Sequence, residues 1–195
     1  MQIGILALQG DFQKHGEHLR RLGREPLYVR SPDDLLKIDG LILPGGESTT
    51  IGKLILDFGL NIPLEKRICD GMPLFGTCAG LILMAREIEG RHQYKLNALD
   101  VTVQRNAYGR QVESFESRMQ SDLFGEMELE GVFIRAPRII RSGPGVEVLV
   151  RFEDDPVLVR EGTNLAAAFH PELTENLSIH AYFRDMVESQ QETGL

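Results

Sequence analysis

The chain has 195 residues, and its 42% hydrophobic and 26% charged residues are typical of a globular protein. A net charge of -8 argues against nucleic acid as a partner, because binding a phosphate backbone needs clustered Lys and Arg. The apolar opening at 3–8 is too short for a signal peptide or membrane span, and two cysteines are too few for a disulfide framework. We therefore expect one cytoplasmic domain over 1–195, either an enzyme or a binding module.

Apolar runs alternate with amphipathic stretches along the first half of the chain, as in βα units around a parallel sheet buried on both faces. Strands are predicted at 3–8, 27–29, 40–46 and 72–76. Helices are predicted at 11–23, 31–39, 48–60, 62–71 and 80–90. Ser31 and Pro32 are suited to the start of the second helix, and Gly23 to the end of the first.

The second half of the chain is rich in strand-like segments, several of which we expect to be antiparallel. These segments are 99–106, 113–120, 131–137, 146–162 and 164–172. Turn signals lie at Gly109, at 143–145 and at 154–156, and an amphipathic helix is predicted at 175–190. With no repeat and no linker, the pattern predicts a single α/β domain whose central sheet is mostly parallel.

Cys78 is the first candidate catalytic residue. It lies in the segment GTCAG, between a predicted strand and a predicted helix, which is the thiol counterpart of a G-x-S-x-G nucleophile elbow. Gly76, Ala79 and Gly80 leave room for a strained turn, and the amide of Ala79 could face an oxyanion. The alternative is a buried structural cysteine; that reading is favoured for Cys69, which has no such turn.

A thiolate nucleophile needs a base, and the base needs a group that orients it. His170 and Glu172 follow an apolar strand in the segment AAAFHPE, and the intervening Pro171 fixes the backbone between them. A histidine at a strand end is often only a structural hydrogen-bonding residue. Its combination with the cysteine elbow favours a Cys, His and Glu triad.

Gly45 and Gly46 end the apolar run LILPGG, where backbone amides can approach a ligand closely. A phosphate-binding loop is excluded, because the spacing to Gly52 and Lys53 is one residue too long and no Ser or Thr follows the lysine. The glycines could supply a second oxyanion donor, or simply form a tight turn in which Glu47 or Ser48 caps the next helix.

Two further sets of polar residues carry weaker signals. His15 and His18 are one helical turn apart, but without a nearby third ligand we expect a solvated helix face and no metal. Arg105 and Arg135 follow predicted strands, where a guanidinium could hold a carboxylate or form a surface salt bridge.

The combination of motifs resembles the class I, triad-type glutamine amidotransferases. More narrowly, LALQG, GLILPGGEST, FGTCAGLI, RNAYGRQVESFE, GVFIRAP and FHPELT together resemble the glutaminase subunits of pyridoxal 5'-phosphate synthase. The resemblance runs from Leu6 to the closing helix. It implies a flavodoxin-like three-layer fold, hydrolysis of L-glutamine through a glutamyl thioester, no cofactor, and a synthase (lyase) subunit that receives the ammonia within a large hetero-oligomer.

The resemblance also implies roles for individual residues. Cys78 would be the nucleophile, His170 the base and acid, and Glu172 the orienting carboxylate. The oxyanion hole would consist of the amides of Gly46 and Ala79. Glutamine would be held by Gly46, Glu47, Ser48, Arg105, Ile134 and Arg135.

Three alternatives remain open from the sequence. The chain could serve another synthase, for instance in histidine biosynthesis. It could be a cysteine peptidase or stress-response protein with a Cys on a similar elbow, although such proteins need no Glu172 after His170. It could also be a binding subunit whose thiol is inert.

Overall fold

A sheet of seven strands in the order β10-β11-β12-β4-β3-β1-β2 forms the centre of the structure, a computed structural model that describes residues 1–105, 114–119, 122–124 and 129–193. Five neighbouring strands, from β12 to β2, are parallel, and β11 and β10 extend one edge in antiparallel fashion. The strands of this sheet are β1 (Ile3–Leu6), β2 (Leu27–Val29), β3 (Gly40–Leu43), β4 (Leu74–Thr77), β10 (Glu147–Phe152), β11 (Asp155–Glu161) and β12 (Asn164–Ala167).

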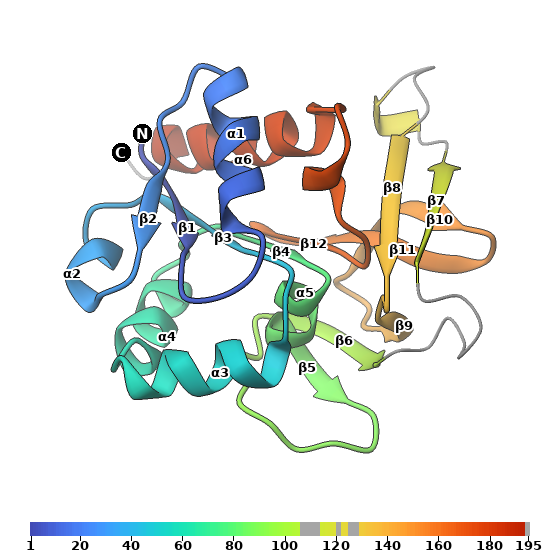
Figure 1. Cartoon of the computed structure of the whole chain (residues 1–195), viewed down its shortest axis with the longest axis horizontal. Coiled ribbons are helices and arrows are strands. Elements are labelled where there is room, and N and C mark those ends of the chain that lie inside the picture. Colours follow the sequence, from blue (N-terminus) through green and yellow to red (C-terminus); the bar gives the residue numbers. More distant parts are fainter. Residues whose placement is uncertain (106–113, 120–121, 125–128, 194–195) are drawn as a thin grey trace.

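Helices cover both faces of this sheet (Figure 1). On one face lie α1 (Phe12–Arg21) and α6 (Ser178–Thr193), and on the other α3 (Ser48–Asp57), α4 (Asn61–Cys69) and α5 (Ala79–Met84). A short helix, α2 (Pro32–Leu35), lies beside β2 at the sheet edge. Because both faces are covered, every residue of β1, β3 and β4 is buried, which explains their unbroken apolar runs.

Two smaller sheets come from the second half of the chain. One has the order β5-β6-β9, formed by β5 (Ala85–Ile88), β6 (Leu99–Gln104) and β9 (Arg138–Ser142). The other is the antiparallel pair β7 (Ser114–Met119) and β8 (Leu129–Ile134), with the 3₁₀ turn η1 (Asp122–Phe124) between them. A second 3₁₀ turn, η2 (Pro171–Leu173), follows β12.

The predicted three-layer α/β architecture with a mostly parallel sheet and added antiparallel strands is confirmed. Two local predictions are wrong. The helix expected at 80–90 ends at Met84, because the next four residues pair with β6, more than ten residues further along the chain. The turn expected at 154–156 lies at 153–154, and Pro156 is already within β11. The turn expected at Gly109 lies outside the described residues.

The parallel strands also determine where the candidate site forms. Strands β1, β3, β4 and β12 run in one direction, so their carboxyl ends lie at one edge of the sheet. The segments that follow them carry Gln9, Gly46, Cys78 and His170. In the described part of the chain, no helix combines the length and the apolar character needed to span a bilayer.

Candidate active site

Cys78 lies on a sharp turn between β4 and α5. Its backbone has φ 47° and ψ -98°, a conformation that L residues rarely adopt, and its amide donates to the carbonyl oxygen of Ala167 at 2.9 Å. The turn fits tightly against the neighbouring strand: a Cβ atom on Gly80 would lie 2.1 Å from the carbonyl oxygen of Leu43. The structure therefore has the strained strand-to-helix elbow that the spacing of GTCAG predicts.

Two hydrogen bonds, one from its backbone and one from its ring, fix the position of His170. Its amide donates to the carbonyl oxygen of Val132 in β8 at 2.8 Å, and its Nδ1 lies 2.7 Å from Oε1 of Glu172. Pro171 opens the 3₁₀ turn that carries Glu172, and this turn places the carboxylate beside the ring two residues earlier. Because Nδ1 is engaged by Glu172, Nε2 is the nitrogen available to the sulfur of Cys78.

The electrostatics of this group favour a charged imidazole. Burial opposes the charge on His170, but hydrogen bonds to Cys78 and Glu172 outweigh it and raise the pKa of His170 to about 10. Burial also opposes the carboxylate of Glu172, yet its hydrogen bond with the charged ring of His170 keeps its pKa below the usual range. At neutral pH the site therefore pairs an imidazolium with a buried carboxylate.

A cavity of about 340 Å³ opens above these groups. Cys78 and His170 line it, and so do all six of the predicted substrate contacts. The lining consists of Gln9, Asp11, Gly46, Glu47, Ser48, Cys78, Ile82, Arg105, Ile134, Arg135 and His170. The predicted site residues outside this lining are Ala79, the first residue of α5, and Glu172, which is buried beside His170.

One wall of the cavity is a polar network around Glu47. The carboxylate of Glu47 accepts from the amides of Thr49 and Thr50 and so caps α3; Glu47 is one of the two caps that the sequence allows. The same carboxylate lies 2.9 Å from Nη2 of Arg105. Burial opposes its charge, but the bonds from both threonines outweigh this and lower its pKa to about 2.

Sequence reasoning missed three contributors to the site. Gln93 accepts from Nη1 of Arg105 at 3.0 Å and so orients the guanidinium. Gln9 accepts from the amide of Glu47 at 2.9 Å, and Asp11 lines the cavity beside it. Gln9 carried a usable signal, because it is a polar residue directly after the apolar run 3–8. Gln93 carried none, since it lies in an irregular segment that only the fold brings to Arg105.

The expectation of a solvated face for His15 and His18 is wrong. Both side chains are buried, with 0% and 3% of their surface exposed, and they meet a third buried histidine, His180 of α6. The cause is the packing of α1 against α6, which joins residues more than 160 positions apart. Cys69, for which a structural role was favoured, is exposed at the end of α4.

In the part of the chain that the structure describes, the possible metal ligands at the site include two residues of the predicted triad. Among the described residues, Asp11, His170 and Glu172 place one ligand atom each within 4.8 Å of one another. A metal on His170 would occupy the imidazole that the predicted triad uses. That no metal takes part stays a prediction.

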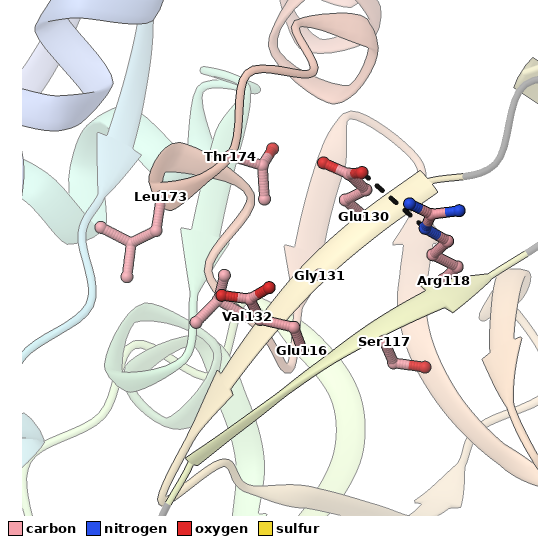
Figure 2. A pocket seen from close by; sticks show the side chains of 8 residues that line it. All are labelled: Glu116, Ser117, Arg118, Glu130, Gly131, Val132, Leu173 and Thr174. Carbon is pink, nitrogen blue, oxygen red and sulfur yellow. Dashed lines mark ion pairs between the residues drawn. The ribbon is translucent and has the colours of Figure 1, made fainter.

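A separate pocket of about 150 Å³ lies between the β7–β8 pair and η2 (Figure 2). Arg118 and Glu130 form an ion pair of 4.0 Å across the two strands there. The pocket shares no lining residue with the larger cavity, so it does not contribute to the candidate site.

The chain matches known proteins over almost its whole length. The model of the SNO glutamine amidotransferase family matches residues 5–189. The pyridoxal 5'-phosphate synthase subunit PdxT of Pelotomaculum thermopropionicum is 55% identical, with 94% of this chain and 93% of the relative covered. The protein of the same name from Thermotoga sp. (strain RQ2) is 51% identical over 96% of this chain and all of the relative.

Solved structures also show a similarity to glutamine amidotransferases. A crystal structure titled glutamine amidotransferase superposes with a TM-score of 0.91 at 51% identity, covering 96% of this chain and 100% of the other. A GMP synthase-like protein from Thermoplasma acidophilum superposes with a TM-score of 0.72 over the full chain and 97% of the other. At 20% identity, this second likeness concerns the fold alone.

Proposed function

Because the chain belongs to the SNO glutamine amidotransferase family, we propose that its cavity hydrolyses L-glutamine to L-glutamate and ammonia with Cys78 as the nucleophile. One observation carries the proposal. The sulfur of Cys78 and the ring of His170 line one cavity, the pKa of His170 is raised by its interactions with Cys78 and Glu172, and Glu172 engages Nδ1 of the ring. This is the arrangement that an activated thiol nucleophile requires.

The first half of the reaction forms a thioester. The imidazolium of His170 stabilises the thiolate of Cys78, which attacks the carboxamide carbon of glutamine. The developing oxyanion is met by the amides of Gly46 and Ala79, each contributing on the order of 3 kcal/mol to transition-state stabilisation. His170 then gives its proton to the amide nitrogen, the C–N bond breaks, and ammonia leaves a glutamyl thioester on Cys78.

The second half releases glutamate. The ring of His170, now neutral, takes a proton from a water molecule that attacks the thioester carbon. The C–S bond breaks, glutamate leaves, and the thiolate and imidazolium are restored. Glu172 keeps Nδ1 of His170 protonated throughout, so that Nε2 carries out both proton transfers.

The cavity wall supplies the groups that hold the substrate. Arg105 can bind the carboxylate of glutamine, because Glu47 and Gln93 fix its guanidinium at the cavity edge. Glu47 carries a full negative charge at neutral pH and suits the substrate's amino group. Gly46, Ser48, Ile134 and Arg135 complete the binding surface.

The ammonia is delivered to a partner. The relatives that match nearly all of this chain are named as subunits of pyridoxal 5'-phosphate synthase. This chain is accordingly the glutaminase subunit, and a synthase (lyase) subunit in a large hetero-oligomer receives the ammonia for pyridoxal 5'-phosphate formation. We propose that this reaction takes place in the cytoplasm.

Glutamate release tests this function. Wild type, Cys78→Ala and the control Cys69→Ala would be assayed with and without a purified pyridoxal 5'-phosphate synthase subunit. We expect wild type and Cys69→Ala to release glutamate, faster with the synthase, and Cys78→Ala to release none. Activity retained in Cys78→Ala would refute the nucleophile, and stimulation only by a different synthase would refute the partner.

A further inference from the structure

A row of three buried histidines leads away from the catalytic carboxylate. His15 and His18 come from α1 and His180 from α6. Nε2 of His15 lies 3.6 Å from Oε1 of Glu172, the same oxygen that Nδ1 of His170 contacts at 2.7 Å. Two imidazoles therefore face one carboxylate oxygen, and the position of the proton on His15 decides whether it competes with His170.

The far end of the row fixes that proton. Nε2 of His18 lies 3.0 Å from the carbonyl oxygen of Thr174, which can only accept a hydrogen bond. His18 must then carry its proton on Nε2, and its Nδ1, 3.1 Å from Nδ1 of His180, is an acceptor. His180 accordingly carries its proton on Nδ1.

The same logic continues to the catalytic end. Nε2 of His180 is an acceptor and lies 2.9 Å from Nδ1 of His15, so His15 carries its proton on Nδ1. Nε2 of His15 is thus left with a lone pair, which the hydroxyl of Thr77 satisfies by donating at 3.2 Å. One carbonyl group sets the tautomers of three rings, and every ring nitrogen in the row has a partner.

We propose that His15, His180 and His18 form a positioning chain for Glu172. In this chain His15 presents a lone pair rather than an N–H to the carboxylate of Glu172, so that His170 is the ring that donates to Oε1. The proposal rests on the roles proposed above for Glu172 and His170. If each ring carried its proton on the other nitrogen, Nε2–H of His15 would face the same oxygen at 3.6 Å and attract its charge. The carboxylate would then stabilise the imidazolium of His170 less.

The surroundings keep the rings neutral. Burial lowers the pKa of His15, of His18 and, most strongly, of His180. The charged and titratable groups that face the row are Asp11, His170 and Glu172 at His15, and Arg21, Glu172 and Glu175 at His18; among the described groups, His180 faces the other two histidines. If the hydrogen bonds between the rings ran in the opposite direction and all contacts were kept, His18 would need a proton on both nitrogens, because the carbonyl oxygen of Thr174 still needs a donor.

Substitution at His18 tests the positioning chain without changing Cys78, His170 or Glu172. His18→Leu removes the acceptor for Nδ1–H of His180. The two remaining rings are then free to exchange tautomers, and an N–H of His15 can face Glu172. In His18→Asn, the side-chain oxygen can replace Nδ1 as the acceptor for His180 and so restore the wild-type proton positions on His180 and His15. Lys14→Met, on the exposed side of the same helix, is the matched control.

For His18→Leu we expect kcat to fall about tenfold with KM unchanged. A tenfold loss is the lower end of the effect seen when a residue that orients a site residue by hydrogen bonding is removed. The basic limb of the pH profile should move to lower pH by about one unit, because the carboxylate of Glu172 would then be shared between His170 and His15 and would support the imidazolium less. His18→Asn should recover most of both effects. A purely structural role would lower the melting temperature and leave the pH profile in place, which would overturn the proposal.

A direct measurement keeps the proposal testable if His18→Leu fails to fold. Long-range ¹H–¹⁵N correlation spectra of the wild type at neutral pH distinguish the two neutral tautomers of each ring. We expect Nδ1–H for His15 and His180 and Nε2–H for His18. Nε2–H on His15 would overturn the proposal, even if glutaminase activity and its dependence on Cys78 were established.

Discussion

A Cβ atom on Gly45 would lie only 2.2 Å from Cε1 of His170. The imidazole packs directly against the backbone of the loop that follows β3, in space that any other residue at position 45 would fill. A glycine in the loop after one strand therefore sets the position of the imidazole that follows another strand.

Gly45→Ala should displace the ring of His170 from the sulfur. Because a displacement of about 1 Å can cost on the order of 100-fold in rate, we expect at least that loss of kcat with the fold retained. Gly145→Ala is the control, since its Cβ would approach the side chain of Glu161, with Oε1 at 3.1 Å, and lies outside the cavity. Equal turnover in both variants, measured as glutamate release, would contradict the packing described.

Glu172→Gln removes the charge while keeping the shape of the side chain. We expect kcat to fall on the order of 1000-fold, because the ring loses the group that fixes its orientation and tautomer. The pKa of His170, now about 10, is raised in part by Glu172, so the basic limb of kcat/KM should move to lower pH. A basic limb unchanged from wild type would show that Glu172 does not support the imidazolium.

Arg105→Lys keeps the positive charge but loses the paired contacts to Glu47 and Gln93. We expect KM for glutamine to rise about tenfold, the equivalent of one hydrogen bond to a charged group, with kcat changed little. Arg141→Lys, which perturbs an exposed ion pair with Asp100 outside the cavity, should leave both constants as they are. A fall in kcat without a change in KM would instead place Arg105 in the chemical step.

Acid should destabilise the fold through the buried histidines. The pKa of His180 lies well below 6.5 in the folded chain and returns to about that value on unfolding, so the unfolded state binds the extra proton. This contribution is present above pH 6.5 and is lost as the pH falls toward the folded value, by up to about 1.4 kcal/mol per pH unit.

His180→Phe removes that titration. Urea midpoints between pH 7 and pH 5 should therefore fall less steeply in this variant than in wild type, whatever its stability at pH 7. The other two histidines continue to titrate, so some slope remains. A slope as steep as that of wild type would mean that His180 is already protonated in the folded chain.

The sequence predicts those parts of the site that lie in contiguous segments. The elbow at Cys78, the pair His170 and Glu172, and the capping of α3 by Glu47 each depend on a few neighbouring residues. The parallel strand pattern then explains why these segments meet, because strands that run in one direction end at one edge.

Contacts between distant segments could not be predicted in this way. His15 and His18 have the spacing of an ordinary amphipathic helix face, and nothing near them in sequence indicates that α6 will bring His180 against them. The same holds for Gln93, whose contact with Arg105 depends on a loop path. The early end of α5 depends on pairing with β6, a tertiary interaction that overrides local helix propensity.

The central claim, that Cys78 is the thiol that attacks glutamine, is tested most directly by covalent labelling with a diazoketone analogue of glutamine in the presence of the synthase subunit. Peptide mapping should locate the label on Cys78, glutamine should slow its attachment, and Cys69→Ala should be labelled as fast as wild type. Labelling of Cys69 or another residue, or labelling of Cys78→Ala at the wild-type rate, would contradict the account.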